Sequence, residues 1–512
     1  MHASRSKKSI VTALIALSVS ACSLQSDYVA PTSTNQSHWS TESTSPAEAD
    51  KSVNPAQTAS DTWWLALSDP AINALIDATF ASNPTLDKAV ARLDEARAQV
   101  GVNRADYFPT LSAKGGINEA NTRINNSGAG GGAGAAASTG MLVGRSRTTS
   151  IGPSLSWELD LFGRVRSSVD AARRRLDART ADAQGARLSI AAQVATTVLD
   201  WRACTHSVEV DAAEIDSREK TLALTRRKLA AGFAAQVEVA SVTRDLSAAQ
   251  TTLVAQQETC ARNVNALIEL SNLDRDALLN VLMQPLPSSD AADAANVVSA
   301  YMPTPPAATL ELPATVLLSH PSVIAADREA AAAWADIGAA RAERFPKLDL
   351  SAALTGEWIR YAGSTLKLTT WSIAPSIAGT LFDAGKGANN VNAAQARYRQ
   401  AAADLQATVR TTVKEVENAL AAQQSAASRL DSSQQSQAAA QVVFNAMQAK
   451  WDNGSASLLE LEDARRQYEI AKDSVITAAR DRASAWVELI RASANNISSN
   501  STQHESNVLP QH

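Results

Sequence analysis

One sequence unit occurs twice in this chain of 512 residues, and this duplication restricts the fold more than any other feature. Asn83-Pro84 opens a helical pattern that ends at Phe108-Pro109, and 237 residues later His320-Pro321 opens one that ends at Phe345-Pro346. Further along, Leu161-Phe162 matches Leu381-Phe382, and Gly232 matches Gly454. Self-similarity at such a distance indicates two copies of one supersecondary unit.

Each copy has the order helix, two strands, a very long helix, a glycine-containing turn and another helix. The stretch from Pro285 to Pro313 is rich in proline and is expected to link the copies. The predicted boundaries are a signal peptide at 1–21, a lipidated N-terminal tether at 22–60, a first repeat at 61–271, an inter-repeat linker or equatorial region at 272–312, a second repeat at 313–491 and a disordered tail at 492–512.

The N-terminus is that of an exported protein. Arg5, Lys7 and Lys8 precede an apolar run that ends at Ala21 and is too short for a stable membrane anchor. The sequence Val-Ser-Ala-Cys22 looks like a bacterial lipobox, in which the Cys22 thiol takes a diacylglycerol. The residue after this cysteine is Ser23 and not Asp, which in bacterial lipoproteins implies sorting to the outer membrane. The alternative is an ordinary cleavage site with a chance cysteine.

Four segments, at about 109–120, 149–161, 347–359 and 367–381, alternate between apolar and polar residues as strands do. A lipid-facing barrel needs such strands, although a soluble sandwich predicts the same alternation. Beyond the signal no run approaches the ~20 apolar residues of a membrane helix, so a membrane-crossing part would have to be a β-barrel. Four strands cannot close a barrel. Two protomers would give a filled lumen of eight strands, and three would give twelve strands with an opening.

The helices are unusually long. From Arg164 to Ala231 there is no proline and one glycine, and at a rise of about 1.5 Å per residue this stretch spans roughly 100 Å. Apolar residues recur every seven positions in the series Val194, Trp201, Val208, Ile215, Leu222 and Leu229. Heptad spacing predicts coiled coils, and an ordinary amphipathic bundle would not need such length.

Spacing also predicts a disulfide. Cys204 lies 28 residues before Gly232 and Cys260 lies 28 after it, so an antiparallel hairpin that turns at Gly232 brings both cysteines to one height. An oxidising periplasm would then join them. The alternative is two buried thiols, if the helices stand too far apart for a disulfide.

Several segments together resemble the TolC superfamily, closest to its lipoprotein branch of OprM and NodT-type channels: RADYFPTLSA, WELDLFGRVR, KLAAGFAAQVEV and KWDNGSASLLELEDARRQ. The resemblance implies a mainly α fold with a small β-barrel. Three protomers, with four strands each, would form a twelve-stranded outer-membrane barrel on a periplasmic coiled-coil tunnel. It further implies a passive exit duct for drugs or other small molecules. Such channels work with a periplasmic adaptor and an inner-membrane pump of RND or MFS type.

The resemblance also places functional residues at the two turns. It implies that the adaptor docks at Gly232, Phe233, Gly454 and Ser455, although these glycines are open to a simpler role as helix terminators. It assigns a periplasmic gate to Glu460, Asp463 and Arg466, with Glu238 latching one hairpin to the other. Three copies of Asp463 would form a carboxylate ring, whereas charges at this spacing are otherwise typical of a solvated helix face. Trp451 and Ala456 depart from the family's usual tip residues.

Other functions have little support. The formal net charge of -5 and the scattered basic residues argue against nucleic-acid binding. The six histidines show no metal-binding or triad spacing, so we expect no enzyme, no metal and no cofactor beyond the lipid on Cys22. Two rival functions stay open, a type I protein-secretion duct and a structural periplasmic coiled-coil lipoprotein. The sequence does not name the cargo.

Overall fold

The computed structural model describes residues 27–30, 39, 62–124, 142–286, 302–306, 309–310, 313–361, 364–494 and 497–498. The predicted signal peptide and the lipidation residue Cys22 lie outside the described residues. The chain forms two compact units. The strand unit comprises residues 1–31, 94–178 and 327–404, and the helical unit comprises residues 32–93, 179–326 and 405–512.

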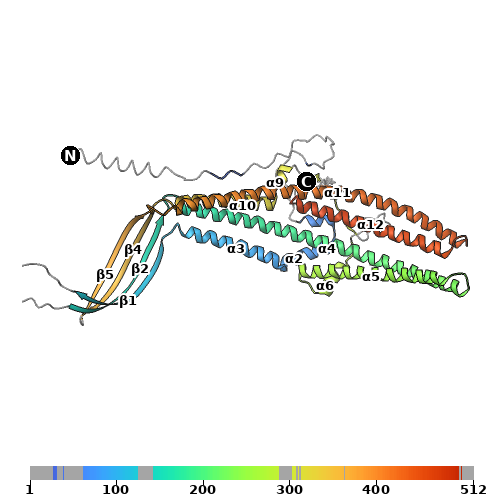
Figure 1. The fold of residues 1–512 in the computed structure, drawn as a ribbon, viewed down its shortest axis with the longest axis horizontal. Coiled ribbons are helices and arrows are strands. Elements are labelled where there is room, and N and C mark those ends of the chain that lie inside the picture. Colours follow the sequence, from blue (N-terminus) through green and yellow to red (C-terminus); the bar gives the residue numbers. More distant parts are fainter. Residues whose placement is uncertain are drawn as a thin grey trace, which may run out of the picture. The chain divides into compact units, whose positions relative to one another are not determined.

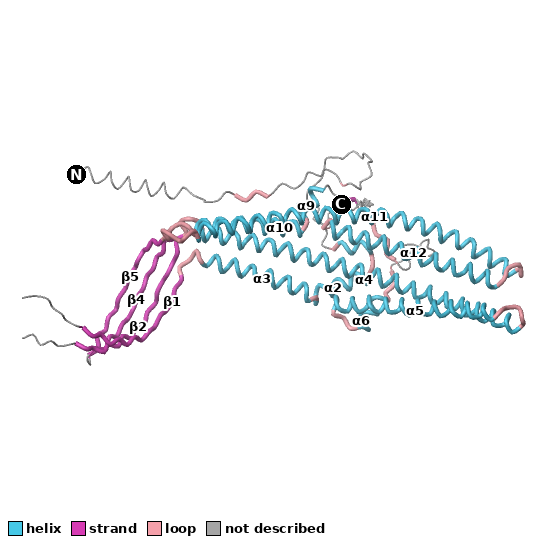
Figure 2. Tube along the Cα trace, in the orientation of Figure 1, coloured by secondary structure: helices cyan, strands magenta, loops and turns pink. Residues whose placement is uncertain are grey.

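A single four-stranded antiparallel sheet makes up the core of the strand unit (Figures 1 and 2). Its strands are β1 (Thr110–Ile124), β2 (Leu142–Leu159), β4 (Lys347–Tyr361) and β5 (Ser364–Ala378), in the order β1-β2-β4-β5. The four predicted strands are therefore confirmed, with shifted ends. β2 starts at Leu142 rather than near residue 149, because its pairing with β1 continues through the polar residues that follow Leu142.

The strand registers assign each side chain to one of two faces. Leu155 of β2 pairs with Leu111 of β1 and with Ala352 of β4, which in turn pairs with Ile373 of β5. Because alternate residues of a strand point to the same side, these four and every second residue from them share one face. We call this the apolar face.

Side chains at the ends of the strands connect the two repeats within this unit. The ring of Phe162, just after β2, stacks on Phe345, just before β4, with centroids 4.8 Å apart. Glu158 accepts two hydrogen bonds from the Arg164 guanidinium, at 2.7 and 2.9 Å. Asp160 accepts the backbone N–H of Arg166 at 2.8 Å, which satisfies a donor at the start of a long helix.

The remaining elements are helical except for two short strands. In chain order they are η1 (Trp63–Leu67), α2 (Pro70–Ser82), α3 (Pro84–Ala105), α4 (Arg164–Ala230), α5 (Gln236–Ser271), α6 (Arg275–Leu282), β3 (Thr309–Leu310), α9 (Pro313–Ser319), α10 (Pro321–Ala342), α11 (Lys386–Asp452), α12 (Leu458–Ala492) and β6 (Ile497–Ser498). We call α4 with α5 the first hairpin and α11 with α12 the second hairpin.

The repeated dipeptides at 83–84 and 320–321 are helix starts. Asn83 Oδ1 accepts the Thr85 N–H at 2.9 Å, and His320 Nδ1 accepts the Ser322 N–H at 3.3 Å. The proline that follows each cap loses nothing at the first helical position, since its missing N–H would have had no partner there. This local chemistry explains why the motif occurs twice.

The core of the helical unit is formed by segments far apart in sequence. α2, α4, α5, α6 and α12 all contribute to one apolar cluster, which includes Leu75, Leu199, Leu267, Leu278 and Ile476, each fully buried. Alanines of α4 and α12 take part as well, and small side chains allow helices to approach closely.

A buried ion pair lies beside this core. The Arg202 guanidinium of α4 donates two hydrogen bonds to the Asp69 carboxylate, both at 2.8 Å. Asp69 also accepts the backbone N–H of Ala71 at 2.9 Å and so caps α2. Both oxygens of this fully buried carboxylate therefore accept hydrogen bonds, and these bonds offset the cost of removing the charge from water.

The linker at 272–312 contains a helix, α6, whose Leu278 and Leu282 are buried in the core. Two other expectations about the connecting segments need correction. The tail expected to be disordered from 492 includes β6, which pairs with β3. Two residues of the tether are also fixed to the fold: the Tyr28 hydroxyl donates to Asp327 at 2.9 Å, and Trp39 is 2% exposed in a small cluster with Val416 and Leu489.

None of the described helices holds a stretch that is both long and apolar enough to span a membrane.

Candidate functional site at the helical turns

Both hairpins turn at a glycine with a left-handed backbone. Gly232 has φ +78° and Gly454 has φ +69°, a region that favours glycine. In the first turn, the N–H of Gly232 donates to Leu229 O at 3.0 Å and that of Phe233 to Lys228 O at 2.8 Å. Gly454 and Ser455 repeat this pair of bonds. The pattern is a Schellman cap, so both glycines do terminate helices.

The turns expose side chains as well as backbone. Phe233 is 84% exposed, and a Cβ built on either glycine would meet nothing within 4 Å. The glycines are therefore required for their backbone angle and not for lack of space. An exposed aromatic ring at a tight turn is open to a partner.

Two of the predicted gate acids cap the helices that follow the turns. Glu460 Oε2 accepts the Ser457 N–H at 2.7 Å, and Ser457 Oγ accepts the Glu460 N–H at 3.3 Å, which makes a capping box. The Ser457 backbone N–H, with its hydroxyl, holds the pKa of Glu460 below its usual value. Glu238 accepts the Ala235 N–H at 3.3 Å in the same way, although Ala235 has no side chain to complete the box.

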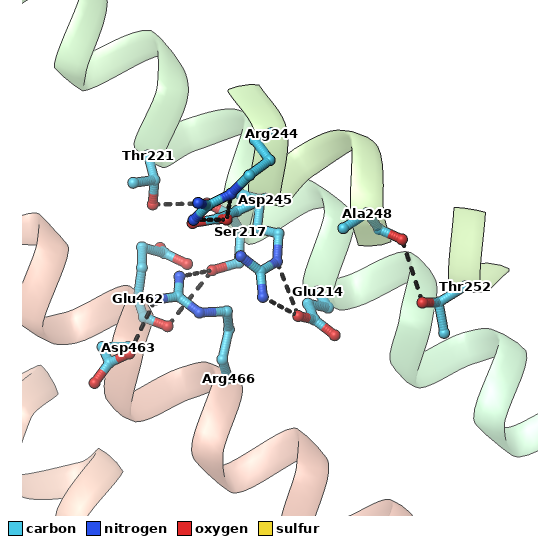
Figure 3. A network of polar contacts seen from close by, with 11 residues as sticks. Glu214, Ser217, Thr221, Arg244, Asp245, Ala248, Thr252, Glu462, Asp463 and Arg466 are labelled. Carbon is cyan, nitrogen blue, oxygen red and sulfur yellow. Dashed lines mark hydrogen bonds and ion pairs between the residues drawn. The ribbon is translucent and has the colours of Figure 1, made fainter. Parts of the chain in front are cut away.

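The other two gate residues lie one turn further along α12. Asp463 is exposed, and Arg466 donates to its carboxylate at 3.0 Å. The Arg466 side chain is only 14% exposed, because it points from α12 toward α4, where it donates to Ser217 Oγ at 3.2 Å (Figure 3). Arg466 thus connects the two hairpins, whereas Asp463 does not.

The two contacts of Arg466 differ in how much free energy they contribute. A surface ion pair three residues apart on one helix contributes about 0.3 to 0.5 kcal/mol, and both partners stay on α12. A hydrogen bond from a charged group to a buried hydroxyl contributes about 1.5 to 3 kcal/mol. Ser217 is 1% exposed. The contact with Ser217 is therefore the one that resists separation of the hairpins.

Sequence reasoning missed the other polar contacts between α4 and α12. Ser207 Oγ donates to Asp473 at 2.6 Å, and Arg480 donates to Asp200 at 2.9 Å. The residues on α12 are seven apart, at 466, 473 and 480. Seven residues are two helical turns, so these contacts follow one side of α12. No motif in the sequence indicates which residues of α4 face them.

Glu462 was also missed. It is 2% exposed, one of its oxygens has no hydrogen-bond partner among the described residues, and the other lies 3.8 Å from Arg465. Its backbone oxygen is 3.5 Å from the Ser217 hydroxyl. The contact surface of α12 therefore includes a buried carboxylate beside Arg466 (Figure 3).

Two titratable groups occupy the middle of the α4–α12 contact. Burial lowers the pKa of His206, against the opposing effect of Asp473 and Glu209 and with the support of Lys472. Burial also raises the pKa of Asp211, which the nearby carboxylates of Asp473 and Glu214 raise further. Both groups are therefore more often neutral than they would be in water.

The first hairpin holds its two cysteines together. Cys204 and Cys260 form a disulfide in the structure, with Cα atoms 5.6 Å apart, as the equal spacing from Gly232 led us to expect. This Cα distance lies within the usual range for a disulfide, so the helices approach closely enough at this height. Among the described residues, no group of three or more His, Cys, Asp or Glu side chains is placed to hold a metal ion.

Comparison with known proteins identifies similar chains. The family described as Outer membrane efflux protein matches residues 75–273 and 312–495. The solvent efflux pump outer membrane protein SrpC of Pseudomonas putida is 27% identical over 93% of this chain and 96% of its own. Outer membrane protein OprJ of Pseudomonas aeruginosa is 27% identical over 94% of each chain. The crystal structure of the CmeC outer membrane channel of Campylobacter jejuni superposes with a TM-score of 0.76 at 20% identity, over 94% of this chain and 96% of that one.

The disulfide leads to the first testable prediction. It closes a sequence separation of 56 residues, for which the chain-entropy relation gives about 4 kcal/mol of stabilisation. Replacing both cysteines by serine should therefore lower the free energy of unfolding by up to about that amount. Thiol titration of the denatured, unreduced protein should find neither Cys204 nor Cys260 free. Two free thiols in that titration would show that the bond does not form in the cell.

His206 leads to a prediction about pH. Since its pKa is lower in the folded protein, the unfolded chain takes up the proton first as the pH falls below about 6.5. The stability that depends on a neutral His206 is present above this pH and is lost as the pH falls toward the folded value. His206→Gln should therefore lose less stability than the wild type between about pH 7.5 and about pH 5.5, measured as thermal unfolding.

His320 is a second buried histidine whose contribution to the acid sensitivity can be compared with that of His206. Burial lowers its pKa as well, so it should leave part of the acid sensitivity in His206→Gln. His206→Gln combined with His320→Gln should reduce the remainder. An acid sensitivity of His206→Gln equal to that of the wild type would remove His206 from the explanation.

Proposed function

The chain belongs to the Outer membrane efflux protein family, and from this membership we propose that it is the passive exit duct of a three-part efflux system. As an outer-membrane efflux protein, it carries compounds away from the cell across the outer membrane of a Gram-negative bacterium. The single observation that supports the duct most directly is the succession of two strands and two long helices in each half of one chain, β1-β2-α4-α5 and β4-β5-α11-α12.

We propose a homotrimer in which three sheets join to form a twelve-stranded barrel. The sheet has two outer strands, β1 and β5, and each has one edge that pairs with no other strand of the described chain. Backbone groups at such an edge need partners where water is absent, and a closed sheet provides them. The apolar face would turn outward to lipid, while the opposite face would line the opening.

We propose that a periplasmic adaptor docks at the two turns, Gly232 with Phe233 and Gly454 with Ser455. The exposed Phe233 ring and the open space around both glycines support this proposal. An inner-membrane pump of RND or MFS type would supply the energy, since a passive duct has none of its own. A covalent lipid on Cys22 would act as a further anchor in the outer membrane.

The proposed gate is the α4–α12 contact just beyond the second turn. Three exposed Asp463 carboxylates around a threefold axis would attract cations to the entrance. Arg466 would hold α12 against α4 through Ser217, and this contact would break when the entrance opens. Glu460 and Glu238 would act indirectly, because each caps a helix and thereby fixes the shape of a turn.

The cargo is proposed to be small molecules. SrpC is named as part of a solvent efflux pump, and it matches this chain over nearly its whole length. Similarity of this kind supports small apolar compounds as a first class to test. It does not distinguish among pumps, because a duct contacts whatever the pump delivers.

Deleting the gene should raise the accumulation of at least one compound in a panel of organic solvents, antibiotics, dyes and aromatic acids. The rise should disappear when the wild-type gene is restored, and the amounts of secreted proteins in the medium should not change. Uptake of radiolabelled or fluorescent compounds measures the first effect, and protein analysis of the medium measures the second. Unchanged accumulation across the panel, with missing secreted proteins, would favour a protein-secretion duct instead.

The gate can be tested by single-channel recording. Arg466→Gln and Ser217→Ala should each raise the open fraction and the conductance, since either change removes the contact between α12 and α4. Asp463→Ala should lower the preference for cations, because three carboxylates would leave the entrance.

Arg244→Gln is the matched control for the gate. Arg244 is exposed on α5, and among the described residues its ion pair is with the adjacent Asp245, so this variant changes the charge equally without touching α12. Conductance should then stay at the wild-type level. If Arg466→Gln behaves like Arg244→Gln, Arg466 does not hold the entrance closed.

A further inference from the structure

The far end of the apolar face is basic. At the end of the sheet remote from α3, α4 and α10, this face carries Arg145 and Arg147 of β2, Arg360 of β4 and Lys367 of β5. The registers place them on the same side as Leu155 and its neighbours, because all are separated from those residues by even steps. The apolar face is thus mostly aliphatic near the helices and positively charged at the opposite end of the sheet.

Neighbouring cations on this face come from three adjacent strands. Arg147 lies directly opposite Arg360, and Lys367 lies opposite Trp358, two residues from Arg360. Directly opposed side chains have Cβ atoms about 5 Å apart, and diagonal neighbours about 7 to 8 Å. Arg147 and Arg360 are therefore close enough for one anionic group to bridge them, and Lys367 lies on the other side of Trp358. We call these three cations with Trp358 the basic corner.

Charge compensation within the protein is incomplete at the basic corner. Glu119 of β1 pairs with Arg145 at 2.8 Å and with Arg147 at 3.7 Å. Among the described residues, neither Arg360 nor Lys367 has an ion pair, and both are exposed. Like charges directly opposite one another destabilise a sheet. An external anion bound between Arg147 and Arg360 would relieve their repulsion.

The position of the basic corner along the sheet matches the outer headgroup layer. Arg147 is twelve residues from Leu159, the last residue of β2, which is about 40 Å at about 3.3 Å per residue. A strand tilt of about 40° reduces this to about 30 Å along the membrane normal, close to the thickness of the hydrocarbon layer. Trp157 and Trp358 lie near opposite ends of this span, as interfacial aromatic side chains do.

We propose that the basic corner binds the phosphate groups of a phosphorylated glycolipid in the outer leaflet, with the acyl chains of the lipid against the apolar face. This inference rests on the proposed function, in which the apolar face meets lipid. The guanidinium groups of Arg147 and Arg360 match a phosphate in shape and charge, and Lys367 provides a point charge for a second phosphate. Trp358 packs beneath the sugar at the boundary between headgroup and chains.

Binding of diphosphorylated lipid A tests the proposal. Full-length protein is placed in phosphatidylcholine vesicles with and without a few mole per cent of this lipid, and native mass spectrometry counts the lipid retained. Arg147→Gln with Arg360→Gln should weaken retention about 30-fold, since each surface cation contributes about fivefold to binding an anionic surface. Arg147→Lys with Arg360→Lys keeps both positive charges but loses the guanidinium shape, so retention should fall between that of the glutamine pair and that of the wild type.

The matched control is on the other face of the same sheet. Lys114→Gln with Lys347→Gln removes two cations from positions whose side chains point away from the apolar face, so binding should stay at the wild-type level. Equal retention by the Arg147→Gln, Arg360→Gln protein and the wild type overturns the proposal. Equal retention of dephosphorylated lipid A by the wild type also overturns it, because acyl chains alone would then account for binding.

Cell fractionation separates this proposal from the duct proposal. Wild-type protein that sediments with the outer membrane and supports efflux, yet retains no lipid A, overturns the basic corner alone. Wild-type protein that fails to reach the outer membrane overturns both. The Arg147→Gln, Arg360→Gln variant should still reach the outer membrane and support efflux, because neither residue belongs to the gate.

Discussion

The packing of α4 against α12 is the contact on which the rest of the helical unit depends. These helices belong to different repeats, and both enter the same buried cluster with α2, α5 and α6. Alanines at the contact, among them Ala191 and Ala483, allow the two backbones to approach closely. That approach brings short side chains such as Ser207 and Ser217 within hydrogen-bonding distance of α12. Without the apolar part of this packing, the polar contacts nearer the turns would have no fixed partners.

The contact between α4 and α12 becomes more polar toward the turns. Around Leu199 and Ile476 the contact belongs to the large apolar cluster. Near Ser217 and Arg466, hydrogen bonds and one buried carboxylate accompany buried apolar side chains such as Leu461. Buried apolar area resists separation over its whole extent, while single hydrogen bonds contribute about 1 kcal/mol each, or about 1.5 to 3 kcal/mol where the donor is charged, and break one at a time. The part of the contact nearest the turns is therefore the more polar part.

The sheet differs from the helical unit in that its side chains do not form a buried core. Every side chain of β5 is exposed, and no described side chain of the other three strands is fully buried, so the alternation along each strand assigns surfaces instead of a core. The apolar face carries Leu155 and Ile373 in its middle and cations at its far end, because the registers place these residues on one side of the sheet. The distribution of side chains on the sheet therefore defines two chemically different surfaces.

The sequence by itself determined the elements whose causes are local. Gly232 and Gly454 mark the turns because only a residue tolerant of positive φ closes a Schellman cap, and alternation located all four strands, although β2 begins at Leu142 and not near residue 149. Equal distances from Gly232 were enough to bring Cys204 opposite Cys260, since both helices of a hairpin rise at one rate. The pattern Ser457-x-x-Glu460 is also local, and it could have shown that Glu460 caps a helix. Only the tertiary structure decided that Arg466 meets Ser217, that Asp473 meets Ser207 and that Arg147 stands opposite Arg360. Such pairs depend on the rotation of each helix and the register of each strand, which are set by packing between segments more than 200 residues apart.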